Sequence, residues 1–453
     1  MTTYLRPIAL AIALAGGAFS STVFAGINEG VAAYEAKDYA TAFTEIKPLA
    51  EKGDAKAQAY LGLMYAFGNG APLDYEQALK WYRLAVEQDN PRAQNGLGYL
   101  YQYGKGVERD YREAVKWYQS AADQKDVRAQ GNLGTMYFLG LGVAQNFKTA
   151  AQWFMKAAAQ GSTDAQFIVG NLYRNGEGFA LDYAEAARWY RLAANQDHVR
   201  SQVALGQLHR TGQGVPQDYA EALKWFRMAA DKGDAAAQYS LGMAYYVGQG
   251  TAKAYPLALK WFTESATQGF SAAQNHLGDM YQQGDGVKKD DKEAAKWFEM
   301  AAIQGHPEAQ FSMGTMYRRG SSAIPASATD AVKWLRLSAD RGNLAARNTL
   351  GALYASGQGV PANRVVAYAL YVLSEGSASA ADNRADWNRI LVDARLDSKE
   401  IAAAQELSRE MAKSKNLLAA MDRYIKDTTP PPPLPKAESE VAPVKATPAS
   451  APQ

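Results

Sequence analysis

Apolar and polar positions alternate along most of the chain with the spacing of amphipathic helices. After Asn90-Pro91, Leu97 and Tyr101 lie four residues apart and therefore on one helical face. Asn is a favoured N-cap, Pro is favoured at the first helical position, and Gly104-Lys105-Gly106 supplies the glycine that often ends a helix. This pattern predicts a helix that begins after Asn90 and ends at Gly104.

A second helix is predicted to begin directly after that turn. Asp110 is its N-cap, and Glu113 stands where it would complete a reciprocal capping box. The same pairing recurs at Asp182 with Glu185 and at Asp218 with Glu221. The apolar stripe of this helix consists of Ala114, Trp117, Ala121 and Ala122. We expect the small alanines to bring helices close, the indole to fill the remaining gap, and Gly98 to admit another backbone.

The two-helix pattern repeats along the chain with a period of 36 residues. The period is clearest in Trp81, Trp117, Trp153, Trp189, Trp225, Trp261 and Trp297, which are 36 residues apart, and in Trp334, which follows after 37. Ala-Gln, Leu-Gly and Tyr recur in the same register, as at Ala93-Gln94, Leu97-Gly98 and Tyr101. A fixed period of this length is typical of solenoid proteins.

These motifs resemble the Sel-one-like repeat family, which is related to tetratricopeptide repeats and has exported bacterial members. The resemblance rests on A-x-x-x-L-G-x-x-Y, G-x-G, D-Y-x-x-A-x-x-W and A-A runs between about Ala55 and Gly376. It implies an all-α fold, a right-handed α-solenoid of about nine 36-residue helix-turn-helix repeats with N-terminal entry helices and C-terminal capping helices. The units are expected to begin near Asp54, Asn90, Asp126, Ser162, His198, Asp234, Phe270, His306 and Asn343.

The segments outside the repeats differ from them in composition. Residues 1–25 are expected to be a secretory signal peptide, because Arg6 precedes the apolar run Ile8–Ala15 and Val23-Phe24-Ala25 ends in the pattern that signal peptidase cleaves. The alternative is an uncleaved N-terminal anchor. The mature protein is expected in the periplasm, or else secreted or exposed on the cell surface.

We expect the mature chain to consist of four parts. They are an N-terminal helix pair at 26–53, the solenoid at 54–378, capping helices at 379–427 and a disordered Pro-rich tail at 428–453. Leu396–Ile401 predicts a cap followed by a helix through Met411. The tail begins with Pro430–Pro435, and it is interpreted as an unstructured end, with a polyproline ligand or a wall-spanning spacer as alternatives.

At three places the sequence departs from the repeat pattern, and each departure predicts a local difference in structure. The sixth unit has Ala254-Tyr255 where others have Asp-Tyr, so its second helix should lack a side-chain cap. The eighth unit has an inserted residue near Gly320–Pro325, where we expect an irregular turn. His209 occupies a Tyr position of the repeat and is expected to be a buried core histidine.

Composition excludes several classes of function. The net charge of 48 − 46 = +2 provides no electrostatic footprint for nucleic acid, and the chain has no Cys and only four His. The sequence contains no zinc-protease, nucleophile-elbow, phosphate-loop or calcium-loop motif. We therefore expect a binding scaffold that is not an enzyme, uses no cofactor or metal and does not span a membrane. A hydrolase is the remote alternative.

Variable residues on the first helix of each unit are the candidate binding residues. In tetratricopeptide-like stacks this helix lines the concave face, and its variable positions fall four and three residues apart. The candidates are Asn95, Tyr99, Gln102, Tyr103, Phe138, Asn171, Arg174, Gln207, Arg210, Tyr246, Asp279 and Arg318. For Phe138, packing against a neighbouring helix is an equal alternative.

The chemistry of these candidates leaves the ligand open. Tyr and Arg favour protein interfaces, so the first hypothesis is a scaffold for a protein or peptide, which includes envelope machinery or a host protein. Aromatic and amide groups also bind sugars, so the second hypothesis is a factor that binds or assembles cell-envelope polysaccharide or peptidoglycan.

Overall fold

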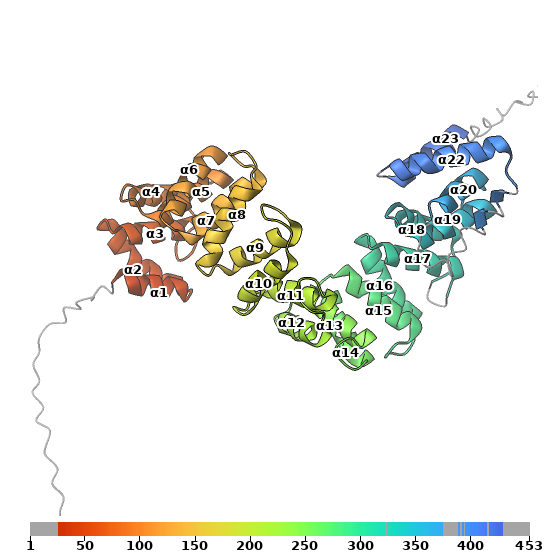
Figure 1. Cartoon of the computed structure of the whole chain (residues 1–453), viewed down its shortest axis with the longest axis horizontal. Helices are drawn as coiled ribbons and strands as arrows, with labels where there is room; N and C mark the ends of the chain where they lie inside the picture. The colour runs from red at the N-terminus through yellow and green to blue at the C-terminus, as the bar shows by residue number, and fades with distance from the viewer. Residues whose placement is uncertain are drawn as a thin grey trace, which may run out of the picture. The chain divides into compact units, whose positions relative to one another are not determined.

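A computed structural model describes residues 26–321, 324–374, 388–389, 392–393, 395–414 and 416–428. Within those ranges all regular secondary structure is α-helical, as the sequence predicts, and consecutive helices are packed in pairs (Figure 1). The segment interpreted as signal peptide, the predicted Pro-rich tail apart from Thr428, and most of residues 379–394 lie outside the described residues.

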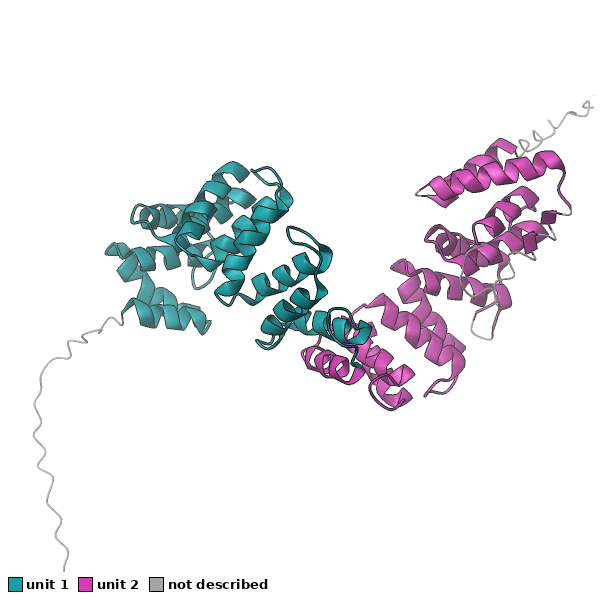
Figure 2. Ribbon diagram, in the orientation of Figure 1, with its two compact units in different colours: residues 1–218 teal, residues 219–453 magenta. Residues whose placement is uncertain are grey.

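The chain divides into two compact units, residues 1–218 and residues 219–453 (Figure 2). Unit 1 contains α1 (Ile27–Glu35), α2 (Tyr39–Glu51), α3 (Ala55–Phe67), α4 (Tyr75–Val86), α5 (Pro91–Tyr103), α6 (Tyr111–Asp123), α7 (Val127–Leu139), α8 (Phe147–Ala159), α9 (Thr163–Asn175), α10 (Tyr183–Ala194) and α11 (Val199–Thr211). Unit 2 contains α12 (Tyr219–Asp231), α13 (Ala235–Val247), α14 (Tyr255–Thr267), α15 (Ser271–Gln283), α16 (Asp291–Ile303), α17 (Pro307–Arg319), α18 (Ala328–Asp340), α19 (Leu344–Ser356), α20 (Arg364–Val372), α22 (Ser398–Lys413) and α23 (Leu417–Thr428).

The predicted start and end signals of the first helix in each repeat are present. The Asn90 side chain accepts a hydrogen bond from the Ala93 N–H, and Pro91 is the first residue of α5. Gly104 ends α5 with a φ of 65°, a left-handed conformation that glycine adopts at low cost. Helix ends are therefore determined by local sequence.

Only one of the two hydrogen bonds of each capping box predicted at Asp110 and Asp182 forms, so these predictions are wrong in part. The Asp110 carboxylate does accept hydrogen bonds from the Arg112 and Glu113 N–H groups. However, the Asp110 N–H donates to the Tyr101 carbonyl at 3.0 Å, so it is not available to Glu113. Glu113 instead pairs with Lys116. At Asp182 the backbone N–H is likewise bonded to a carbonyl of the preceding helix, because the turn folds back onto the end of that helix.

The residue after the repeated Trp is more consistently buried than the Trp itself. Trp153, Trp225 and Trp261 are buried, as expected of the indole, but Trp117 is only half-buried, whereas Tyr118 is fully buried on α6. A Cβ atom at Gly98 would lie 2.6 Å from the Tyr118 ring, so Gly98 admits this ring and not another backbone. Gly170 admits the ring of Tyr190 in the same way. In most repeats a buried aromatic ring therefore packs on the helical glycine, whereas Leu335 takes the place of the ring opposite Gly314.

A ladder of buried glutamines joins neighbouring repeats. Gln130 donates to the Ala122 carbonyl of the preceding repeat and accepts a hydrogen bond from Gln160, which follows α8 in its own repeat. Equivalent pairs form in both units, as at Gln274 with Gln304. The bonds from the buried glutamines to these carbonyls tie neighbouring repeats together through the core.

The ladder ends at Gln310. Because of the inserted residue in this repeat, Arg341 stands at the position of the donating glutamine, and the Gln310 side-chain oxygen has no hydrogen-bond partner among the described residues. The residue before it, Asp340, accepts a hydrogen bond from the Leu418 N–H of α23. The glutamine pair is thus absent where the C-terminal helices contact the repeats.

The C-terminal helices pack against the last repeats. α22 begins at Asp397 with a complete capping box to Glu400, and it extends past the predicted Met411 to Lys413. α23 packs on α18, where Arg336 binds Asp422 at 2.7 Å and also donates to the Tyr354 hydroxyl.

The local departures also have structural consequences. Ala254 provides no side-chain cap for α14, as expected. Gly320 ends α17 with a ψ of 157°, whereas Gly284 ends α15 with a ψ of 27°, so the turn after α17 is irregular. His209 is buried beside Arg191, which confirms a core histidine. None of the described helices is both long and apolar enough to cross a bilayer.

Candidate functional site

Every predicted binding residue lies on the first helix of a repeat, and nine of the twelve lie in unit 1. They are Asn95, Tyr99, Gln102 and Tyr103 on α5, Phe138 on α7, Asn171 and Arg174 on α9, Gln207 and Arg210 on α11, Tyr246 on α13, Asp279 on α15 and Arg318 on α17. We call the exposed faces of these odd-numbered helices the helix-A surface. The structure does not gather all twelve residues into one site.

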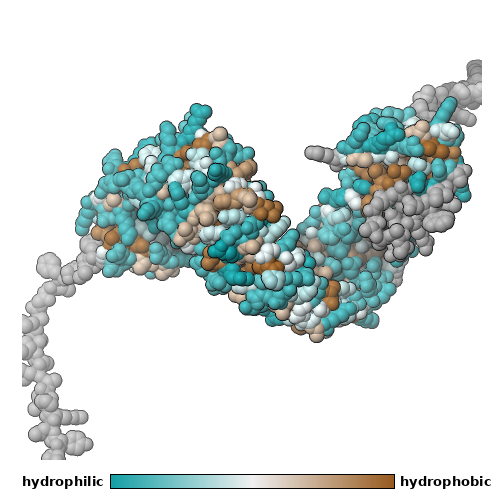
Figure 3. All heavy atoms as spheres, in the orientation of Figure 1, coloured by the Kyte–Doolittle hydropathy of each residue, from teal (hydrophilic) through white to brown (hydrophobic). Residues whose placement is uncertain are grey.

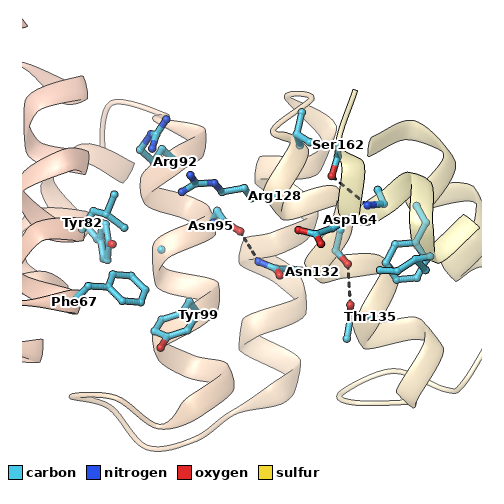
Figure 4. Close-up of a pocket in the computed structure, with 17 residues that line it drawn as sticks. Phe67, Tyr82, Arg92, Asn95, Tyr99, Arg128, Asn132, Thr135, Ser162 and Asp164 are labelled. Atoms are coloured by element: carbon cyan, nitrogen blue, oxygen red, sulfur yellow. Dashed lines mark hydrogen bonds between the residues drawn. The ribbon is translucent and has the colours of Figure 1, made fainter. Parts of the chain in front are cut away.

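A pocket of about 390 Å³ opens on the helix-A surface of unit 1 (Figure 4). α3, α5, α7 and α9 contribute most of its lining, and its floor includes the rings of Tyr82 and Phe154. Asn95 and Tyr99 are the two predicted residues that line it. A Cβ atom at Gly131 would meet nothing within 4 Å, so this glycine keeps the α7 side of the pocket open.

Two asparagines form the polar centre of the pocket. The Asn132 amide donates to the Asn95 side-chain oxygen at 2.9 Å, a contact drawn in Figure 4. Within the described residues, the Asn95 amide nitrogen and the Asn132 oxygen form no other hydrogen bond. The pair therefore offers one donor and one acceptor, which is the complement of a backbone peptide group.

Two arginines stand above this pair at equivalent positions of successive repeats. The Arg92 guanidinium lies 4.2 Å from the centre of the Tyr60 ring, and burial raises the pKa of that tyrosine. Arg128 is exposed on α7. Neither arginine forms an ion pair with a carboxylate of the described residues. The acid in the lining, Asp164, contacts His198 at 3.3 Å. With two arginines and one aspartate, the pocket lining thus has a net positive charge.

Aromatic rings form the opposite end of the pocket. Phe67 is 49% exposed although it is a large apolar residue, and its ring lies 5.3 Å from that of Tyr99. Tyr99 in turn lies 4.8 Å from Tyr103, which is also exposed. On the face shown in Figure 3 the hydrophobic residues of each unit form small patches among hydrophilic ones. An apolar ligand group would find at Phe67 and Tyr99 a surface that the fold leaves unused.

Several other predicted residues take part in packing. The Tyr118 hydroxyl donates to Gln102, and the Tyr190 hydroxyl donates to Asn171. Phe138 packs on Phe147, with ring centres 5.1 Å apart. These side chains support the helix-A surface from within.

The remaining predicted residues of unit 1 are more exposed. Tyr103 extends the aromatic end described above, and Arg174 is exposed at the end of α9, where its guanidinium donates a hydrogen bond to its neighbour Asn175. Arg210 donates to Gln207 at 2.8 Å, so these two side chains hold each other.

In unit 2 the predicted residues are separate from the pocket. Tyr246 donates to Asp285 at 2.6 Å. Asp279 is largely buried on α15, and burial raises its pKa to about 6. Arg318 is exposed on α17.

Sequence reasoning missed several pocket residues, among them Phe67, Arg92, Arg128, Asn132 and Asp164. Arg92, Arg128 and Asp164 are each the second residue of the first helix in a repeat, and Asn132 is the sixth. The candidates all came from later positions of the helix, apart from Asn95. A comparison of the second position across repeats would have shown a basic residue in unit 1 at Lys56, Arg92, Arg128 and Arg200.

The family model of the Sel1 repeat matches this chain nine times in succession. The matched residues are 55–90, 91–126, 127–162, 163–198, 199–234, 235–270, 271–306, 307–343 and 345–374. The chain is a Sel1 repeat protein. The family assignment and the all-α solenoid fold expected from the sequence are thereby confirmed.

Two solved structures are similar to this Sel1 repeat protein over most of their length. A protective antigen present in uropathogenic Escherichia coli strains, which has the same repeat fold, is 29% identical, covers 86% of this chain and 98% of its own, and has a TM-score of 0.58. A Sel1 repeat protein from Oxalobacter formigenes is 28% identical, covers 74% of this chain and 94% of its own, and also has a TM-score of 0.58. No curated protein sequence matches the chain.

Membership of the family establishes a coarse function. Sel1 repeat proteins are scaffolds for protein interaction. In such scaffolds the variable residues on the surface of the repeats are free to differ, because the core contacts that hold the repeats together do not use them. The lining of the pocket on unit 1 includes variable residues of this kind, among them Arg92, Asn95 and Tyr99.

Proposed function

We propose that this Sel1 repeat protein is an exported, non-enzymatic scaffold that holds a segment of a partner protein in the pocket of unit 1. The segment carries a carboxylate that binds Arg92 and Arg128, and an apolar side chain that packs on Phe67 and Tyr99. The observation that carries the proposal is the pair of arginines that face the pocket without an acidic partner among the described residues.

The energetics of the pocket favour such a ligand. Hydrogen bonds from guanidinium to carboxylate are among the stronger polar contacts in proteins, and they gain strength as water is excluded. Arg92 is held against Tyr60, so it loses little side-chain freedom when it binds. Tyr99 and Phe67 are large apolar groups that are partly exposed before binding, so covering them is favourable.

The asparagine pair would determine how the segment runs. Asn95 and Asn132 offer a donor and an acceptor between the arginines and the aromatic rings. A peptide group placed there satisfies both, so the segment crosses the pocket with its carboxylate toward the helix N-termini and its apolar side chain toward Tyr99. The N-termini of α5 and α7 add favourable partial charge for the carboxylate.

The proposal is tested by selecting displayed peptides on the mature chain and measuring the affinity of the enriched peptides. Peptides that combine an acidic and an apolar residue are expected. Arg128→Glu should weaken their binding by at least about tenfold, because an attraction between opposite charges becomes a repulsion. The matched control is Arg112→Glu on α6, which makes the same change at the second residue of a helix outside the pocket. Equal effects of both substitutions would contradict the proposal.

Polysaccharide binding has a different dependence on the pocket. Sugars stack on aromatic rings, so retention on purified cell-wall material that is lost in Tyr99→Ala and unchanged in Arg128→Glu would replace the peptide ligand with a glycan. Retention that needs both residues supports an acidic segment or an acidic sugar, and a competing synthetic peptide distinguishes the two.

Export is supported by residues 1–25, which have the charge and apolar pattern of a signal peptide. Cell fractionation and N-terminal sequencing are expected to find a periplasmic chain that begins at Gly26. A cytoplasmic chain that retains Met1 would overturn this part of the proposal.

A further inference from the structure

A cluster of rings on α13, α14 and α15 in unit 2 surrounds His276. The His276 imidazole is stacked on Phe262, with ring centres 5.4 Å apart and an interplanar angle of 9°. Tyr239 and Tyr246 lie 5.6 and 6.3 Å from the same imidazole. The ring faces carry partial negative charge, so the cluster favours a cation and disfavours an anion.

Asp279 lies one turn after His276, and no Lys or Arg of the described residues forms an ion pair with it. Its side chain is 30% exposed. One carboxylate oxygen, Oδ2, accepts a hydrogen bond from Asn275 at 3.2 Å, and the His276 Nδ1 is 3.9 Å from the same oxygen. The other oxygen, Oδ1, has no donor within the described part of the chain.

Asn275 leaves a second acceptor unsatisfied beside Asp279. It is only 7% exposed, its amide N–H is directed at Asp279, and its side-chain oxygen has no hydrogen-bond partner among the residues that the structure describes. A buried polar atom without a partner costs about 1–3 kcal/mol. Asn275 and Asp279 together therefore lack donors.

The repeat explains why a donor is missing at this place. Asp279 occupies the position that Asn171 has in unit 1, where the Tyr190 hydroxyl donates to it at 2.7 Å. The residue equivalent to Tyr190 in the Asp279 repeat is Phe298, which is fully buried and has no hydroxyl. Among the described residues, this repeat therefore provides Asp279 with no hydroxyl donor.

The other charged groups near the cluster do not provide it. His276 is kept neutral, because burial and the neighbouring His306 lower its pKa. His306 contacts Glu308, and Asp285 accepts a hydrogen bond from the Tyr246 hydroxyl, so neither group is directed at Asp279.

Lys253 shows how the outer rings of the cluster interact with a cation. Its ammonium group lies over Tyr255 at 4.5 Å and over Tyr246 at 5.9 Å, and it forms no ion pair with an acid of the described residues. These rings therefore already attract an ammonium group.

We propose that Asp279, Asn275 and the rings of Tyr239, Tyr246 and His276 form a binding site for the ammonium group of a lysine side chain on a partner protein. A single ammonium can donate to Asp279 Oδ1 while it lies against the rings. A guanidinium fits less well, because its fork needs both carboxylate oxygens and Asn275 occupies one of them. The site is in unit 2 and does not depend on the pocket of unit 1.

The test uses a short peptide with one lysine and the same peptide with that lysine acetylated. Both are titrated into the mature full-length chain while the ring resonances of its four histidines are recorded by NMR. The lysine peptide is expected to shift the His276 resonance, and the acetylated peptide is expected to leave it unchanged. Equal shifts with both peptides, or a shift with neither, would overturn the proposal.

Two variants connect the effect to Asp279 without depending on a disrupted fold. Asp279→Asn keeps the shape of the side chain and should weaken the lysine peptide about tenfold, since it removes the charge. The matched control, Asp231→Asn, removes an exposed acid at the end of α12 and should have no effect. Phe298→Tyr supplies the missing hydroxyl from within, as Tyr190 does in unit 1, and should also weaken binding although the carboxylate remains. Full affinity in Asp279→Asn would overturn the site.

Discussion

The two units are built from the same repeat, yet their helix-A surfaces differ in charge at equivalent positions. At the second position of the first helix, unit 1 has Arg92 and Arg128, whereas unit 2 has Ala236 and Ala272. At the ninth position, unit 1 has Asn171, whereas unit 2 has Asp279. The buried glutamines and helical glycines that hold the repeats together are shared. Surface positions can therefore change their charge without a change of fold, because the core contacts do not use them.

The buried aromatic position shows how the core affects the surface. In unit 1, the hydroxyls of Tyr118 and Tyr190 donate hydrogen bonds to the side-chain oxygens of Gln102 and Asn171. These two side chains on the helix-A surface are therefore already bonded to the core. In unit 2, Phe298 stands at this core position and donates nothing. One hydroxyl group therefore decides whether a polar side chain on the helix-A surface supports the fold or remains available to a ligand.

The largest effect is expected from removing this buried aromatic in either unit. Tyr118→Ala and Phe298→Ala should each lower the free energy of unfolding of their own unit by about 3–5 kcal/mol, because a large ring packed on a helical glycine is lost. Hydrogen exchange should increase mainly on α5–α7 in the first variant and on α15–α17 in the second, since repeats contact only their neighbours. Increased exchange over the whole chain in either variant would refute this locality.

A smaller, pH-dependent effect is expected at Asp279. Its pKa is raised to about 6 in the folded protein by burial, so the folded state binds this proton more tightly than the unfolded state. The contribution of the protonated Asp279 side chain to the stability of the fold is therefore present at acidic pH and is lost as pH rises through about 6. Asp279→Asn should be more stable than the parent chain by about 1–2 kcal/mol at pH 8 and equal to it near pH 4.

Urea denaturation at these two pH values measures that difference. Asn171→Asp is the counterpart in unit 1, where the Tyr190 hydroxyl still donates to the new carboxylate. This variant should show a weaker pH dependence, and an equal one would remove the distinction between the two units.

Phe298→Tyr should make the surroundings of Asp279 in unit 2 resemble those of Asn171 in unit 1. A hydroxyl donor favours the ionised carboxylate, so the pKa of Asp279 is expected to fall by about one unit. NMR titration of the Asp279 side chain measures this directly. Phe226→Tyr introduces the same hydroxyl in the repeat whose ninth position is Gln207, and it should leave the pKa of Asp279 unchanged. A pKa that stays at about 6 in Phe298→Tyr would show that the missing hydroxyl is not the cause.

The smallest effect concerns the residue between repeats. Unit 1 has Lys125 there with a φ of 67° in one repeat and Gly161 with a φ of 91° in the next, and unit 2 has Gly269 there with a φ of 88°. Lys125→Gly should raise stability by about 0.5–1 kcal/mol, because a side chain is strained at positive φ. Gly269→Lys should lower it by a similar amount, although its Cβ atom would meet nothing within 4 Å. Thermal unfolding compares the two, and shifts of the same sign would contradict the explanation.

The repeat architecture could be predicted because its signals are local and recur nine times. Asn90, Pro91 and Gly104 determine the ends of α5 wherever that helix packs. The capping box at Asp110 could not be predicted, because the competing acceptor, the Tyr101 carbonyl, becomes a neighbour only when the turn folds back. Adjacent aromatics such as those at 117 and 118 pose a similar problem, since helical periodicity alone does not determine which one faces the glycine.

The binding sites were less predictable for a related reason. The sequence pattern located Asn95 and Tyr99 on the helix-A surface, where the structure has a pocket, but Arg92 and Arg128 at an earlier position of the same helices were missed. Asp279 was a candidate, yet its chemistry depends on the absence of a hydroxyl on the next helix. Such effects arise from pairs of residues that only the packed structure brings together.

The most direct test of the charge difference between the two units is one binding experiment with two ligands. The affinities of an acidic-apolar peptide and of the lysine peptide are measured on the parent chain, on Arg128→Glu and on Asp279→Asn. We predict that Arg128→Glu loses only the acidic peptide and that Asp279→Asn loses only the lysine peptide. If either substitution weakened both peptides equally, or neither, the two helix-A surfaces would not be separate sites of opposite charge preference.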